Sequence, residues 1–224
     1  MFLAGALGSD IAALESLYTL SQQHETLLMT EFSRRYTPAT TRLRELMATR
    51  LGPATELNVE ALVPLQAARG AVPGQDCERD YLAGLFDWCH YITGRTPSTI
   101  RATPLPESTP SSAGEPWQVE VGFRLDPTGL PSTLARLTLR PAEMTDETSD
   151  EWPFPHHDVV CERGRALISQ ATEIRWQNCA EPEMGTEQLL TEQTDAEVML
   201  MQFTRRVLGG LVPGADDPNV SRAL

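Results

Sequence analysis

Apolar residues at helical spacing run through the first fifty positions and predict two helices. The first helix is expected to begin after an N-cap at residues 9–10. Its apolar face includes Leu14, Leu28 and Phe32. Polar residues interrupt the stripe, which extends over about 25 residues toward residue 36. An apolar face of this length needs a second surface to pack on.

The second helix has clear signals at both of its ends. Thr37 is a suitable N-cap, and Pro38 fits the first helical position, where its missing N–H costs nothing. Gly52 and Pro53 follow the last apolar residue in the order that ends a helix. The two helices are therefore expected to form a helical hairpin or a kinked pair.

The pattern is irregular over residues 55–70 and becomes helical again after them. Pro64 lies inside the first segment, and a proline costs about 3 kcal/mol in a helix interior, so we expect a broken helix or an irregular segment. Asp76 then caps a third helix, which carries apolar residues at helical spacing and ends at Gly94.

The period of the pattern changes to two in the middle of the chain. Residues 98–103 are expected to form a short strand, and residues 117–125 and 133–140 alternate between apolar and polar side chains. A turn at residues 126–129 separates the two alternating segments, which predicts an antiparallel hairpin.

Helical spacing returns in the last third of the sequence. From Asp158 the apolar positions up to Ile174 fit a helix, although Gly164 weakens it and a strand for part of 166–176 is the alternative. Thr186 caps a final helix that carries Met199 and Phe203 and ends at a pair of glycines.

Together these elements predict an α+β fold with an N-terminal helical hairpin, a small antiparallel sheet containing a central hairpin, and C-terminal helices. The expected organisation is a helical region at 1–72, an α+β domain at 73–212 and a flexible tail at 213–224.

The negative net charge of the chain disfavours the binding of some classes of partner. The formal net charge is −13, which repels phosphate backbones and anionic lipids, so neither nucleic acid nor a membrane is expected as a partner. The arginines between Arg34 and Arg50 are interpreted as a solvated helix face. All 18 basic residues are arginine, and a protein without lysine cannot form a lysine Schiff base.

Cysteine usage and the lack of long apolar runs indicate an intracellular, reduced protein. Four cysteines in 224 residues are too few for a disulfide scaffold. The apolar run at the N-terminus is too short for a signal peptide, and no run reaches the length of a membrane-spanning helix.

Cys161 and His157 form the one local pair with catalytic potential. Four residues apart on a helix, an imidazole and a thiol face each other, and a nearby imidazole lowers a thiol pKa. The alternative interpretation is a buried small cysteine beside two exposed histidines. No ligand spacing typical of zinc is present, and no metal site or cofactor is expected.

The leading hypothesis is a non-enzymatic assembly, adaptor or structural subunit, a class that includes components of viral or phage-type particles. It rests on apolar helix faces that would bind a protein partner or a second copy, with these interaction residues: Leu14, Leu28, Phe32, Met199 and Phe203. Two alternatives remain open: a thiol-dependent enzyme using Cys161 and His157, and a small-molecule-binding module under the hairpin between Trp117 and Phe123.

Overall fold

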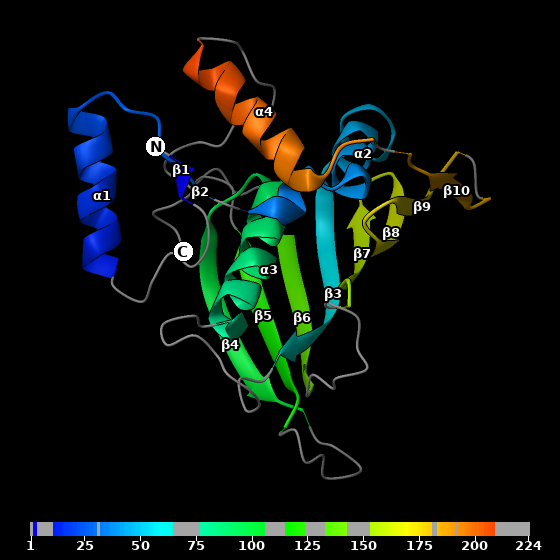
Figure 1. Ribbon diagram of the computed structural model, residues 1–224. Helices are drawn as coiled ribbons and strands as arrows, with labels where there is room; N and C mark the ends of the chain where they lie inside the picture. The colour runs from blue at the N-terminus through cyan, green and yellow to red at the C-terminus, as the bar shows by residue number, and fades with distance from the viewer. Residues whose placement is uncertain are drawn as a thin grey trace.

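The centre of the molecule is a mixed sheet of eight strands (Figure 1). The computed structural model describes residues 2–3, 11–30, 32–64, 77–105, 115–123, 133–142, 153–180, 183–190 and 192–208. The strand order is β10-β9-β8-β7-β3-β6-β5-β4. Only the central pair, β3 with β6, is parallel, and the six other pairs are antiparallel.

The described strands have the following bounds: β1 Phe2–Leu3, β2 Met29–Thr30, β3 Ala54–Pro64, β4 Pro97–Pro104, β5 Trp117–Phe123, β6 Thr133–Ala142, β7 His156–Cys161, β8 Gly164–Gln170, β9 Glu173–Asn178 and β10 Gly185–Gln188. The described helices and turns are α1 Ile11–Gln23, the 3-10 turn η1 Ser33–Tyr36, α2 Pro38–Leu46, the π turn η2 Met47–Leu51, α3 Cys77–Thr93 and α4 Asp195–Val207. Strands β1 and β2 form a separate parallel pair.

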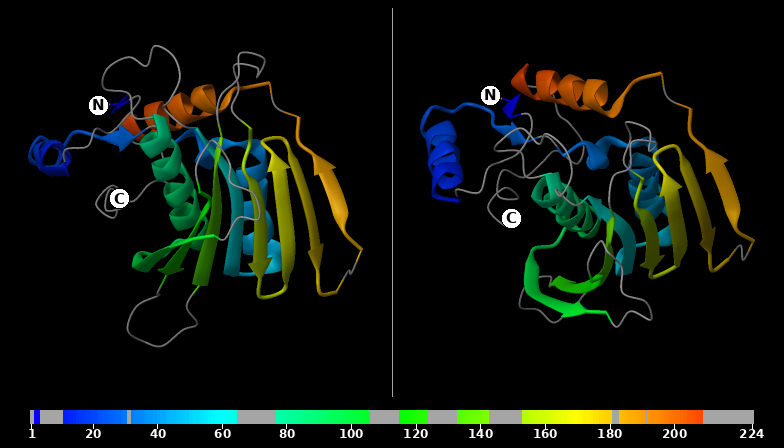
Figure 2. Two further views of the ribbon diagram at one scale, coloured as in Figure 1. Left: turned by 90° about the horizontal axis from the view of Figure 1, so that it is seen from below. Right: turned by 60° about the horizontal axis from the view of Figure 1, so that its bottom comes forward.

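Helices α2 and α3 cover one face of the sheet (Figure 2). Alternate residues of β3 point to this face, and Leu57, Val59, Ala61 and Val63 are all buried. Fully buried side chains of the helices, such as Leu43 of α2, belong to the same core cluster as these β3 residues. Burial of this two-layer core is the main stabilisation of the fold.

The opposite face of the sheet carries cross-strand ion pairs. Arg136 of β6 pairs with Glu56 of β3 and Glu120 of β5, and Arg165 of β8 pairs with Asp158 of β7. No helix of the described residues lies on this face (Figure 2). The strands therefore show the alternation of a sheet that is buried on one side and polar on the other.

Several local signals of the sequence are confirmed. The Thr37 side chain accepts a hydrogen bond from the N–H of Thr40 at 3.3 Å, and Pro38 opens α2. Gly52 and Gly94 follow their helices with φ of +77° and +61°, the conformation that favours glycine. Strands β5 and β6 form the expected antiparallel pair, and β4 lies beside β5.

The predicted fold class is nevertheless wrong, because the sheet is large and mixed. A broken helix or irregular segment is expected over residues 55–70, and residues 54–64 instead form β3 at the centre of the sheet. In place of the helix expected from Asp158 to Ile174, the chain forms the three strands β7, β8 and β9, joined by tight turns. Gly164 marks the start of β8, where a Cβ atom would overlap the carbonyl oxygen of Gln177.

The terminal helices also differ from the prediction. Helix α1 ends at Gln23, Glu25 takes a φ of 50°, and Figures 1 and 2 place α1 away from α2, so the helical hairpin is not formed. Residues 185–188 form an edge strand, and the last helix begins only at Asp195, with a complete capping box between Thr194 and Glu197.

The expected domain boundary at 72–73 and the tail at 213–224 lie outside the described residues. Among the helices that are described, none is both long and apolar enough to cross a membrane.

Candidate functional site

A cluster of polar and aromatic side chains lies where η1 meets α3 and β7. Arg34 of η1 places its guanidinium over the ring of Tyr81 in α3, with 4.6 Å from Cζ to the ring centroid. One helical turn along, a Cβ atom on Gly84 would lie 3.4 Å from Nε of Arg34. The absence of a side chain at Gly84 therefore allows the arginine to lie close against α3.

Arg34 makes no ion pair with a carboxylate within the part of the chain that the structure describes. Its side chain is half-buried, and burial lowers its pKa, opposed in part by the Tyr81 hydroxyl. A guanidinium that has lost solvent and has no carboxylate beside it is an incomplete arrangement in a folded protein. An anion supplied from outside the cluster would complete it.

The neighbouring Arg35 is fully paired. It forms a two-pronged ion pair with Asp87 of α3, in which Nε donates to Oδ2 at 2.7 Å. Both side chains are buried, and burial raises the pKa of Asp87 while the hydrogen bonds and charge of Arg35 lower it. This pair joins η1 to α3 and holds the backbone of Arg34 in place.

His157 is the second incomplete group of the cluster. Its ring lies between Trp88, with centroids 4.0 Å apart, and Phe154, at 5.5 Å edge-on. The side chain is 1% exposed, and neither ring nitrogen has a well-formed hydrogen bond among the described residues, although the peptide groups of Pro155 and Ile168 approach the ring. Unsatisfied buried nitrogens of this kind require an explanation in a native fold.

Electrostatics links His157 to Arg34. Burial lowers the pKa of His157 to about 3, and the positive charge of Arg34 is the next cause. The imidazole is therefore neutral near pH 7 and offers one donor and one acceptor. The cluster combines an uncompensated cation, a neutral imidazole and aromatic surface, a set that suits a small anionic ligand with hydroxyl groups.

Cys161 and His157 do not have the geometry of a catalytic pair. Both lie on β7, where four residues span roughly 13 Å, whereas a helix would have brought them together. Burial raises the pKa of the Cys161 thiol to about 12, which is opposite to the activation that a thiolate needs. In the described residues no group of three potential metal ligands gathers.

The residues expected to bind a partner contribute mainly to contacts within this chain. Met199 of α4 is buried against Met29 and Tyr36, and Phe203 packs on the same small cluster. Phe32 is buried and Leu28 is half-buried, while the side chain of Leu14 lies outside the described part. Under the hairpin, Phe123 belongs to the core and Trp117 is exposed.

The interpretation of the arginines from Arg34 to Arg50 as a solvated helix face does not hold for Arg34 and Arg35. Arg34 and Arg35 precede α2 and turn toward α3, where Arg35 is almost completely buried. One signal in the sequence favours this placement: two adjacent arginines stand directly before Tyr36 and the helix cap at Thr37, in a strongly acidic chain. The position of Gly84 opposite Arg34 depends on tertiary structure and has no local signal.

Solved structures with this fold include dehydrogenases. The chain is similar to UDP-N-acetylglucosamine 3-dehydrogenase GnnA from Acidithiobacillus ferrooxidans, with 15% identity over 99% of this chain and 66% of that one, and a TM-score of 0.70. It is also similar to an oxidoreductase from Agrobacterium radiobacter in complex with NAD+, L-tartaric acid and magnesium, with 14% identity, 98% and 67% of the two chains covered, and a TM-score of 0.66. A super-repressor mutant of Gal80p from Saccharomyces cerevisiae shares the fold as well, with 11% identity, 95% and 60% covered, and a TM-score of 0.68.

The chain spans less than two thirds of the length of the first of these dehydrogenase structures, 65% and 66% in two crystal forms. It matches no protein-family model and no curated protein. At these identities the similarity establishes the fold, and the Gal80p structure shows that the fold also occurs in a repressor. The neighbours point to an oxidoreductase fold, so the prediction of an assembly, adaptor or structural subunit is wrong.

The described residues do not fit a dinucleotide. Dinucleotide-binding units consist of parallel strands with a glycine-rich turn before a helix, whereas the sheet described here has one parallel pair among seven. The glycine spacing G-x-G-x-x-G occurs nowhere in the sequence. We therefore assign these residues no role in holding a dinucleotide.

Proposed function

We propose that this chain binds a small anionic, hydroxyl-bearing molecule in the cluster formed by η1, α3 and β7, and serves as the substrate-binding part of an oxidoreductase-type protein. The observation that supports the proposal is Arg34, whose half-buried guanidinium has no carboxylate partner among the described residues. In the same cluster, the neutral His157 has two buried ring nitrogens without a well-formed hydrogen bond among the described residues.

The chemistry of the ligand follows from these two groups. A guanidinium binds a carboxylate or phosphate through two parallel hydrogen bonds, which fix both its position and its orientation. A neutral imidazole exchanges a hydrogen bond with a hydroxyl group, and the rings of Tyr81 and Trp88 contribute apolar surface. The uncompensated positive charge of Arg34 can hold one anionic group of the ligand beside the imidazole.

The names of the structural neighbours agree with this ligand class. One of them acts on UDP-N-acetylglucosamine, and another was solved with L-tartaric acid; both molecules combine anionic groups with hydroxyl or amide groups. If the present chain takes part in a redox reaction, the dinucleotide has to be held by residues other than the described ones or by a separate protein. The part proposed for this chain is to bind and orient the molecule that reacts.

Isothermal titration of the purified protein tests the proposal. The titrants are L-tartrate, glucuronate and UDP-N-acetylglucosamine, with glycerol as a neutral hydroxylated control. We expect at least one anionic titrant to bind and glycerol not to bind. Arg34→Gln removes the charge and is expected to weaken binding about tenfold or more, as the loss of a charge-assisted hydrogen bond does.

Arg101→Gln is the matched control, because Arg101 lies exposed on β4 and far from the cluster in sequence. Its affinity is expected to equal that of the unmodified protein. Failure of all three anions to bind would contradict the proposal, as would equal affinities of the Arg34 and Arg101 variants.

A further inference from the structure

A cavity lies between the end of η1, α2, the segment after β10 and the start of α4. Its volume is about 430 Å³, within the range of small-molecule sites. Pro38, Leu189 and Val198 give it apolar walls, and Tyr36 contributes an aromatic ring. Its charged lining consists of Arg42, Glu45 and Asp195.

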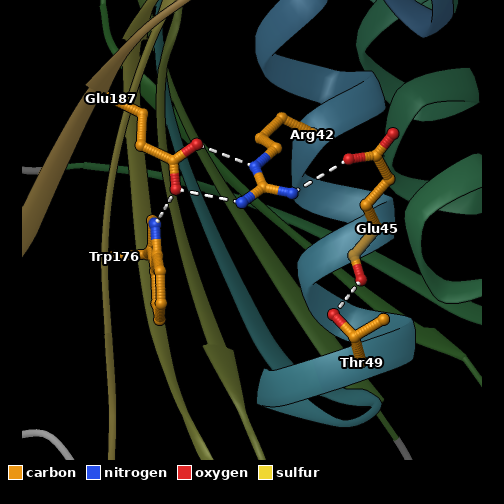
Figure 3. A network of polar contacts seen from close by, with 5 residues as sticks. All are labelled: Arg42, Glu45, Thr49, Trp176 and Glu187. Atoms are coloured by element: carbon orange, nitrogen blue, oxygen red, sulfur yellow. Dashed lines mark hydrogen bonds and ion pairs between the residues drawn. The ribbon is translucent and has the colours of Figure 1, made fainter.

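Arg42, the arginine in the cavity lining, already forms ion pairs within this chain (Figure 3). Arg42 donates to both carboxylate oxygens of Glu187, at 2.8 and 3.1 Å, and to Glu45 at 3.0 Å. Trp176 donates its indole N–H to the same Glu187 carboxylate at 2.6 Å, and the guanidinium of Arg50 lies 5.0 Å from the Trp176 ring. All three guanidinium nitrogens of Arg42 are thus engaged, so this arginine is not available to an anion.

Asp195, unlike Arg42, forms no ion pair within the described residues. It lies half-buried in the first turn of α4. Burial raises its pKa, because a half-buried carboxylate has lost part of its solvation. Arg42, the one cationic side chain among the described residues that line the cavity, is held by Glu187 and Glu45 and does not pair with Asp195.

We propose that this cavity binds a small organic ammonium ion. The ammonium group pairs with Asp195, and its hydrocarbon stem packs against Pro38, Leu189 and Val198. Tyr36 completes the lining at the η1 end of the cavity. The site is separate from the cluster around Arg34 and selects a ligand of the opposite charge.

The test compares n-butylammonium with its neutral analogue n-butanol, with the methyl resonances of Leu189 and Val198 as the NMR readout. We expect saturable shifts of these methyl groups with the ammonium ion and none with the alcohol. Asp195→Asn is expected to weaken binding about tenfold. Asp195→Glu keeps the charge and is expected to retain most of the affinity, which distinguishes a loss of pairing from a loss of fold.

Glu183→Gln removes one exposed carboxylate outside the cavity and controls for the total charge of the protein. Its affinity for n-butylammonium should be unchanged. Two results would overturn the proposal: no saturable shift of the Leu189 and Val198 methyl groups, or equal affinities in Asp195→Asn and Glu183→Gln. Neither result bears on anion binding at Arg34.

Discussion

Two groups of side chains each contain an arginine that contacts a second element: the cluster around Arg34, between η1 and α3, and the network around Arg42, between α2 and strands β9 and β10. The two arginines differ in their partners. Arg42 in the network has every guanidinium nitrogen bonded to a carboxylate of this chain. Arg34 in the cluster lies against an aromatic ring and a glycine, with no carboxylate among the described residues. The first arrangement ties a helix to the sheet edge, whereas the second is complete only with a ligand.

Arg35 shows that position in the fold, and not residue type or proximity in sequence, decides the role. It stands next to Arg34 and is more deeply buried, yet its charge is neutralised by Asp87. The pair is structural, and the burial of Arg35 requires its carboxylate. Structural and ligand-binding arginines are therefore expected to differ in their effect on stability.

Removing the carboxylate of the buried pair is expected to have the largest effect. Asp87→Ala leaves Arg35 buried without a counter-ion, and the free energy of unfolding should fall by about 3–5 kcal/mol. Urea denaturation measures it. The control Asp158→Ala breaks a more exposed pair with Arg165 and should cost about 0–1 kcal/mol. Similar losses in the two variants would show that Arg35 and Asp87 are not a buried structural pair.

Acid is expected to destabilise the protein through His157. The folded-state pKa is about 3 and the ordinary value is 6.5, so between these values only the unfolded chain takes up a proton. Stability is therefore complete above pH 6.5 and declines as the pH falls, by about 2 kcal/mol at pH 5. Urea denaturation between pH 7 and 5 should show this slope, and His157→Phe should remove it. An unchanged slope in the variant would place the titrating group elsewhere.

Breaking the network around Arg42 is expected to cost less than breaking the buried pair. The Arg42 and Glu187 side chains are each 30% exposed, and solvent screens their attraction. Arg42→Gln should lower the free energy of unfolding by about 0.5–1 kcal/mol, and 1 M salt should reduce the difference. A loss above about 3 kcal/mol would mean that this pair contributes as much as the buried one.

Substitution of Arg34 is expected to have the smallest effect on stability. Arg34→Gln leaves no carboxylate of the described chain without its partner and removes only the contact with the Tyr81 ring, so the free energy of unfolding should fall by about 0.5 kcal/mol. Thermal unfolding without ligand measures this change. A large destabilisation would identify Arg34 as a structural residue like Arg35.

The sequence predicts an element well when all of its signals are local. Helix α3 has unbroken apolar spacing and ends at Gly94, and the β5–β6 pair shows clean alternation. Strand β3 is missed because Pro64 and its acidic residues obscure an alternation that Leu57, Val59 and Ala61 do show. Strands β7 to β9 are missed because short alternating segments also fit helical spacing, so that Gly164 resembles a weak point in a helix.

The parallel pairing of β3 with β6 is beyond local reasoning. These strands are separated by α3, β4 and β5, and only the assembled core selects their neighbours. The candidate site could not be predicted from the sequence for the same reason. Arg34 and His157 lie more than a hundred residues apart in sequence, and a charged residue near a helix start is ordinarily solvated.

The most direct measurement is the NMR spectrum of the arginine Nε–Hε groups with and without the anion that binds tightest in the titrations. We predict that the Arg34 resonance moves on addition of ligand, while those of Arg35 and Arg42, held by Asp87 and Glu187, stay in place. Movement of the Arg42 resonance with an unchanged Arg34 resonance would contradict the assignment of the ligand site.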